Sequence, residues 1–118
     1  MGPTDISITE RPEWADTVAC CGLATSPVGE ADAERLALMF KALGDPVRLR
    51  LASMIASAPE VCVCELTPAF DLSSGTISHH LKVLRDAGLV DSERRGTYVY
   101  YRVRPEALAA LAALVSPG

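Results

Sequence analysis

The sequence predicts a mainly helical domain with a β-hairpin, arranged as a winged helix-turn-helix with a helical dimer interface. Three observations predict this fold class. Residues 72–90 read as an amphipathic helix with a serine at its start and a glycine at its end, and a short helix lies just before it across a tight turn. Two β-rich stretches follow it, so a hairpin wing completes the unit.

Residues 1–29 are expected to form a mobile arm that precedes a folded domain at 30–118. The arm contains prolines, glycines and scattered acidic residues, with no sustained hydrophobic period. Its unusual features are Trp14 and the adjacent pair Cys20 and Cys21.

A first helix is predicted over residues 30–43, and Gly44 ends it. Asp45 and Pro46 then start a second helix, because aspartate caps a helix well and proline suits the first helical position. The expected apolar stripe of the first helix is Ala33, Leu36, Ala37, Phe40 and Leu43. The expected buried face of the second is Val47, Leu51, Met54, Ile55 and Ala58, which leaves Arg48 and Arg50 outside.

The two helices of the helix-turn-helix come next. The first should begin between residues 63 and 65 and run to Phe70, because Pro68 is tolerated only near a first turn. The second should be capped by Ser73 and ended by Gly88. Its buried stripe is predicted to be Ile77, Leu81 and Leu84.

Strands are predicted over residues 89–94 and 97–103, with Arg95-Gly96 as a two-residue turn. Pro105 then opens a last helix, in which Leu108, Leu111 and Leu114 or Val115 recur three to four residues apart. This helix has too few polar residues to be solvated on all sides. Together with the first helix it therefore predicts a homodimer.

The overall negative charge, taken alone, argues against a nucleic-acid partner, but the distribution of charge along the chain favours one. The net charge is −4, but residues 1–45 hold eight acidic and three basic residues, whereas residues 76–118 hold four acidic and six basic ones. Positive charge is thus concentrated near the candidate reading helix. The longest apolar run, 107–115, is too short to cross a membrane, and no secretory signal is seen, so we expect a cytoplasmic protein with reduced thiols.

The exposed side of the second helix of the helix-turn-helix is suited to a DNA major groove. Hydroxyl and imidazole groups can bond to base edges, and basic groups can bond to phosphates. His80 is expected to pack or cap instead, because adjacent side chains diverge on a helix. The residues predicted to contact DNA are Ser74, Thr76, Ser78, His79, Lys82, Arg94 and Arg95.

Three segments, residues 40–50, 61–66 and 77–90, resemble the ArsR/SmtB family of winged-helix repressors. The resemblance covers about residues 30–115. It implies a homodimer that sits on an inverted-repeat operator in double-stranded DNA and leaves it when a metal or metalloid binds. Ser74-Gly75 departs from the family pattern, which more often has glutamine followed by proline or serine.

The four cysteines are the candidate ligands of the inducing ion. Cys62 and Cys64 resemble the family's thiolate motif, and residues 20–25 resemble the arm of its arsenic-sensing actinobacterial members. The positive end of a helix lowers the pKa of a thiol and favours the thiolate that soft ions bind. We therefore expect arsenite or antimonite to bind Cys20, Cys21 and one of the other two, with Cys62 favoured because it precedes the helix.

Other functions fit parts of the pattern. A cadmium or lead sensor would use all four cysteines, a thiol-based redox regulator would use them without a metal, and an interaction dimer would never bind DNA. Residues 105–118 hold no histidine, so a zinc site on that helix is not expected. No organic cofactor and no enzymatic activity are expected, because no oxyanion loop or acid partner accompanies the cysteines and histidines.

Overall fold

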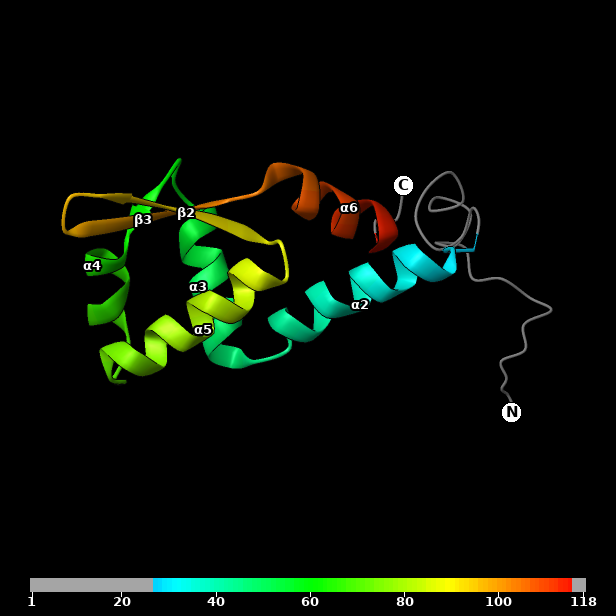
Figure 1. The fold of residues 1–118 in the computed structure, drawn as a ribbon. Helices are drawn as coiled ribbons and strands as arrows, with labels where there is room; N and C mark the ends of the chain where they lie inside the picture. The colour runs from blue at the N-terminus through cyan, green and yellow to red at the C-terminus, as the bar shows by residue number, and fades with distance from the viewer. Residues whose placement is uncertain (1–26, 116–118) are drawn as a thin grey trace.

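The structure is a computed structural model that describes residues 27–115. Its elements are the helices α2 (Glu30–Leu43), α3 (Pro46–Ala56), α4 (Val63–Leu66), α5 (Ser74–Asp86) and α6 (Pro105–Val115), the 3-10 helix η2 (Thr67–Ala69), and the strands β1 (Val61–Cys62), β2 (Val90–Arg95) and β3 (Tyr98–Val103). The β2–β3 hairpin and α4 lie at one end, and α2 and α6 at the other (Figure 1). The predicted winged helix-turn-helix, mainly α with a β-hairpin, is confirmed.

The three strands form one antiparallel sheet in the order β1-β3-β2. The β2–β3 ladder runs from Val90 opposite Val103 to Arg95 opposite Tyr98. The sequence did not predict β1, because a strand of two residues gives no alternation to detect. Since β1 leads directly into α4, the sheet holds the start of the helix-turn-helix against the wing.

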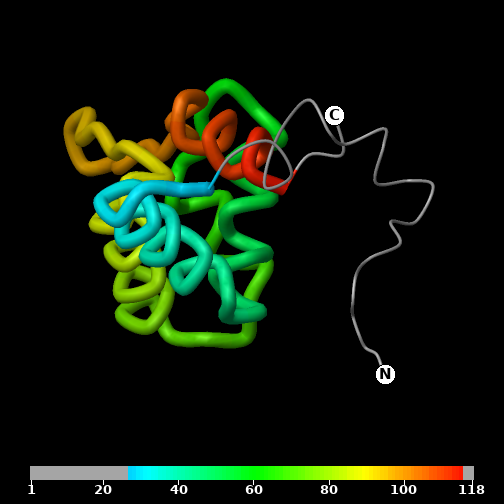
Figure 2. The backbone as a smooth tube through the Cα atoms, turned by 90° about the vertical axis from the view of Figure 1, so that its right-hand side faces the viewer, coloured from blue at the N-terminus to red at the C-terminus, as the bar shows by residue number. Residues whose placement is uncertain are grey.

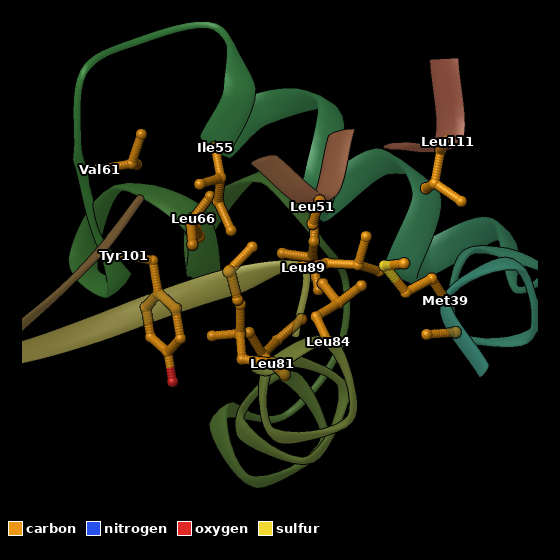
Figure 3. Packing of buried hydrophobic residues seen from close by; sticks show 14 of the residues in the cluster. Met39, Leu51, Ile55, Val61, Leu66, Leu81, Leu84, Leu89, Tyr101 and Leu111 are labelled. Carbon is orange, nitrogen blue, oxygen red and sulfur yellow. The ribbon is translucent and has the colours of Figure 1, made fainter. Parts of the chain in front are cut away.

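One hydrophobic core joins the helices to the sheet. Ile77 and Leu84 of α5 are completely buried and Leu81 is 1% exposed, so the buried stripe predicted for this helix is confirmed. Leu81 and Leu84 lie close to Leu51 of α3 in this core (Figure 3). Each such side chain contributes roughly 1.5–3 kcal/mol by leaving water. This packing fixes the rotation of α5, so its opposite face points outward.

The predicted helix starts are confirmed by their hydrogen bonds. Asp45 Oδ2 accepts from the backbone N–H groups of Val47 at 3.0 Å and Arg48 at 3.1 Å, and the bond from Arg48 contributes most to lowering the pKa of Asp45. Ser73 Oγ accepts from the N–H of Thr76 at 3.1 Å. Gly88, just after α5, has a φ of +84°, the left-handed conformation that glycine adopts most easily.

The predicted stripe of α2 is wrong in part. Leu36 is buried as expected, but the other buried residues are Met39 and Ala42, while Ala37 and Phe40 are exposed. The buried face of α2, which meets α3 and α5, is therefore rotated about the helix axis relative to the predicted apolar stripe. A face of α2 that includes Phe40, at 40% exposure, remains uncovered in the single chain.

Two further boundaries differ from prediction. The first helix of the helix-turn-helix has only four residues and passes into η2, because Pro68 lacks the N–H that an α-helix would need there. The hairpin is shifted by one residue: Arg95 is the last paired residue of β2, and the turn is Gly96-Thr97, with Gly96 at φ +65°. A shift of one residue moves a side chain to the other face of the ribbon.

The last helix, α6, packs its Ala107 and Leu111 into the core, while Val115 is 59% exposed. Figure 2 shows α6 passing above α2 at this end of the molecule, and the two helices line a shared surface hollow of about 330 Å³. Within residues 27–115, no helix combines the length and the apolar character needed to cross a membrane. Residues 1–26 of the predicted arm, including Cys20 and Cys21, lie outside the described residues.

Candidate functional site

The exposed face of α5 presents the side chains predicted to read DNA. The five predicted residues on this helix are all exposed: Ser74, Thr76, Ser78, His79 and Lys82. Gly75 leaves the first turn open, since the nearest atom that a Cβ there would meet is Ser73 Oγ at 4.0 Å. The structure thus brings these residues together on one surface of one helix.

Two of these residues have partners within the helix or at its cap. Thr76 Oγ1 lies 2.9 Å from Ser73 Oγ, and Lys82 Nζ donates to Asp86 Oδ2 at 2.7 Å. The hydrogen bond from Lys82 lowers the pKa of Asp86. Both side chains of this ion pair are more than half exposed, so the pair is weak in water and Lys82 can exchange Asp86 for a phosphate.

His80 has a structural position, as the sequence suggested. It is half-buried, and its Nδ1 lies 3.3 Å from Nη1 of Arg48 at the start of α3. The Nε of Arg48 donates to the carbonyl oxygen of Ala42 in the last turn of α2 at 2.6 Å. Arg48 therefore joins the C-terminal end of α2 to the reading helix, a link that the helical pattern alone did not predict because it placed this arginine outside.

The two arginines predicted for the wing lie on opposite faces of the hairpin. Successive residues of a strand alternate between faces, so Arg94 shares a face with Val90, which is buried in the core, and Arg95 shares the other face with Glu93. Arg94 is exposed. Arg95 instead donates to Glu60 at 2.7 Å through each of two nitrogens and to Glu93 at 3.2 Å.

The two cysteines of the described region differ in accessibility. Cys62 is 5% exposed, because it is paired in β1 and caps α4: its Sγ accepts from the N–H of Cys64 at 3.3 Å, and its own N–H donates to Glu65 at 2.9 Å. Cys64 is exposed. The expectation that Cys62 is the freer thiol is therefore wrong, and Cys64 is the sulfur that a second segment can reach in this conformation.

The expected lowering of thiol pKa at this helix start is wrong for Cys64. The side-chain hydrogen bond with Cys62 raises the pKa of the Cys64 thiol, and partial desolvation and the nearby Glu65 carboxylate act in the same direction. A helix of four residues has too few aligned peptide dipoles to outweigh these effects. A soft cation would reverse this balance, since a coordinating thiol is deprotonated.

The thiol pair alone does not complete a metal site. Among residues 27–115, no group of three or more histidine, cysteine, aspartate or glutamate side chains is placed to hold an ion. Cys62 and Cys64 supply two soft donors, whereas arsenite takes three thiolates in a pyramid. The other two cysteines of the chain, Cys20 and Cys21, lie outside the described residues.

The fold and the exposed face of α5 define the class of the protein: it is a winged helix-turn-helix transcriptional regulator. Residues 45–92 match the family model described as "Bacterial regulatory protein, arsR family". The chain is 39% identical over 72 residues to the arsenical resistance operon repressor of Bacillus subtilis strain 168, covering 61% of this chain and 69% of that protein. The chain belongs to the ArsR family.

Two other relatives differ in the ion that their names indicate. The chain is 49% identical over 69 residues to the arsenic resistance transcriptional regulator ArsR1 of Pseudomonas putida KT2440, covering 58% of this chain but 54% of that protein. It is 36% identical over 81 residues to the cadmium resistance transcriptional regulatory protein CadC of Listeria innocua, covering 69% of this chain and 68% of that protein. The chain thus spans about half the length of ArsR1.

A solved structure supports the same class. The homodimeric winged helix-turn-helix DNA-binding domain of a possible ArsR-family regulator from Mycobacterium bovis matches 75% of this chain and 84% of its own length, with a TM-score of 0.61 and 27% identity. The family consists of DNA-binding transcriptional regulators, so the expectation that the chain is not an enzyme is confirmed.

The sequence pattern did not indicate the residues that hold Arg95. Glu60 is 35 positions away in the chain, and the one-residue error in the hairpin register placed Arg95 in the turn, where no strand partner is expected. The alternation of Glu93 and Arg95 along one strand was the available signal, because side chains two apart share a face.

Proposed function

We propose that this regulator is a homodimeric repressor of a metal(loid) resistance operon, released from its operator when arsenite or antimonite binds cysteine thiolates. The observation that carries the proposal is the place of the thiol pair. Cys62 and Cys64 lie at the start of the first helix of the helix-turn-helix, and the second helix presents the reading face. An ion held there acts on the unit that contacts DNA.

The DNA contacts follow from the exposed chemistry. Ser74, Thr76, Ser78 and His79 bond to base edges, since hydroxyl and imidazole groups can donate to or accept from them. Lys82, Arg94 and Arg95 bond to phosphates, which supply affinity without sequence preference. Lys82 exchanges its exposed partner Asp86 for the phosphate.

A homodimer is supported by large apolar side chains that stay exposed on α2 and α6. Leu38 of α2 is 60% exposed and Val115 of α6 is 59% exposed. A second copy of the chain would cover such side chains, and a two-fold dimer matches an inverted-repeat operator. The M. bovis domain, which is described as homodimeric, is in line with this arrangement.

For the inducer site, we propose Cys20 and Cys21 together with Cys64, because Cys64 is the exposed thiol of the pair. Cys62 is adjacent and becomes a fourth ligand if α4 opens at its start. That four-thiolate site is the cadmium or lead alternative, which the likeness to CadC supports. Free thiols and contact with chromosomal DNA are both expected in the cytoplasm, so we place its action there.

The test is operator release by different inducers. A duplex selected from a random library with the reduced protein is labelled, and its fluorescence anisotropy is followed as arsenite, cadmium or hydrogen peroxide is added. We expect arsenite to release the duplex at concentrations near that of the protein, with cadmium and peroxide ineffective there. Release by cadmium but not arsenite would establish the alternative metal sensor, and release by peroxide alone would establish a redox regulator.

A further inference from the structure

We propose that Glu60 restrains the wing of this repressor by holding Arg95 away from DNA phosphate, so that Glu60 is a positioning residue that lowers operator affinity. The proposal rests on the contact between wing and DNA that is part of the proposed function. It concerns four side chains that we call the wing ion cluster: Glu60, Glu93, Arg95 and Arg102.

The geometry places the charged end of Arg95 over the hairpin rather than beyond its tip. The guanidinium carbon lies 4.5 Å from the centre of the Tyr100 ring, and Tyr100 is opposite Glu93 in the ladder, two residues back from Arg95. Two guanidinium nitrogens donate to the two carboxylate oxygens of Glu60, each at 2.7 Å. The side chain is thus folded back along the ribbon and held at both nitrogens.

Glu60 occupies the groups that a phosphate would use. The planar guanidinium fork binds carboxylate and phosphate in the same two-pronged geometry, so one guanidinium edge serves one of them at a time. Arg102 is drawn into the same cluster, with its Nη1 at 3.8 Å from Glu60 and 3.4 Å from Glu93. Two arginines facing two glutamates leave the cluster without net charge, although it lies on a wing predicted to meet a polyanion.

The exposure of the pair makes it exchangeable. The side chain of Arg95 is 44% exposed and that of Glu60 is 34% exposed. Solvent-exposed ion pairs contribute little to folding, so a phosphate can compete for Arg95. Glu60 therefore opposes phosphate binding by occupying the guanidinium of Arg95.

The test compares Glu60→Gln with Glu34→Gln, which removes the same charge from an exposed position on α2, at the end of the molecule away from the wing (Figure 1). Affinities for the selected operator and for a random duplex are measured over a range of salt concentrations. We expect Glu60→Gln to tighten both by about fivefold at low salt and to steepen the salt dependence by about one counterion per wing. Glu34→Gln should change neither.

A double-variant cycle distinguishes the effect of Glu60 through Arg95 from the effect of removing a negative charge anywhere on the protein. Arg95→Ala should weaken DNA binding. In the Arg95→Ala protein, a further Glu60→Gln change should alter DNA affinity no more than Glu34→Gln does. Glutamine keeps the length of Glu60 and one of its hydrogen-bond acceptors, so a second variant, Glu60→Ala, removes the side chain beyond Cβ. This variant should also tighten DNA binding, and an unchanged circular dichroism spectrum checks that it is folded.

The outcomes distinguish this proposal from the function on which it rests. Weaker or unchanged binding in both Glu60 variants, while Lys82→Ala still weakens binding, overturns the restraint and leaves the repressor assignment intact. A tightening that persists in the Arg95→Ala background also overturns it. A wild-type protein that selects no operator overturns both.

Discussion

Replacing Cys20 and Cys21 by serine, singly or together, is expected to abolish arsenite-induced release of the operator and to leave binding by the arsenite-free protein unchanged. Of the three proposed ligands, Cys20, Cys21 and Cys64, each single variant keeps two and the double variant keeps one, and the fourth cysteine, Cys62, is buried. If arsenite weakens the wild-type complex by roughly 100-fold, the variants lose a coupling free energy of about 2.7 kcal/mol. The measurement is operator anisotropy with and without arsenite.

Two controls accompany this experiment. Cys62→Ser should retain release, because the buried Cys62 is not one of the three proposed ligands, whereas Cys64→Ser should lose it. Linkage also requires the operator to weaken arsenite binding by the same factor by which arsenite weakens operator binding. Release that persists in the Cys20→Ser, Cys21→Ser double variant would show that the arm does not hold the ion.

The second large effect is expected on DNA affinity. Changing Lys82, Arg94 and Arg95 together to alanine should weaken binding to every duplex and flatten the salt dependence by about one counterion for each phosphate that is no longer bound. Arg35→Ala is the matched control, because Arg35 lies on α2 and pairs with Asp32 at 3.4 Å. An unchanged salt slope in the triple variant would refute the phosphate assignment.

Changes on the base-reading side should act differently. Ser78→Ala or His79→Ala removes a group that can bond to base edges but leaves the phosphate-binding side chains in place. These variants should narrow the gap in affinity between operator and random DNA, with little change in the salt slope. Equal losses of affinity on both duplexes would instead assign these residues to the backbone.

The reading helix was predictable because several local signals agree. The apolar spacing of Ile77, Leu81 and Leu84, the cap at Ser73 and the stop at Gly88 all specify the same helix in the same rotation. The buried stripe in turn determines which residues face outward. The predicted set of exposed side chains on this helix therefore agrees with the structure.

Features set by contacts between distant segments were less predictable. The buried face of α2 depends on where α3 and α5 approach it, so Met39 is buried and Phe40 is exposed although both are apolar. The hairpin register depends on Gly96 adopting a positive φ, and the pairing of β1 with β3 is too short to leave a pattern. The short β1 strand contains the buried Cys62 and leaves Cys64 as the accessible thiol, and the hairpin register places Arg94 and Arg95 on opposite faces of the wing.

In the proposed inducer site, one arsenite ion joins the arm to the thiol pair through three sulfurs. An absorption titration of the reduced dimer with arsenite, which counts the thiolates bound per ion, tests it directly. We predict three thiolates per ion in the wild-type protein and in Cys62→Ser, and two in Cys20→Ser, Cys21→Ser and Cys64→Ser. A count that stays at three when Cys20 or Cys21 is replaced, or a wild-type count of two, would rule out a site made of Cys20, Cys21 and Cys64.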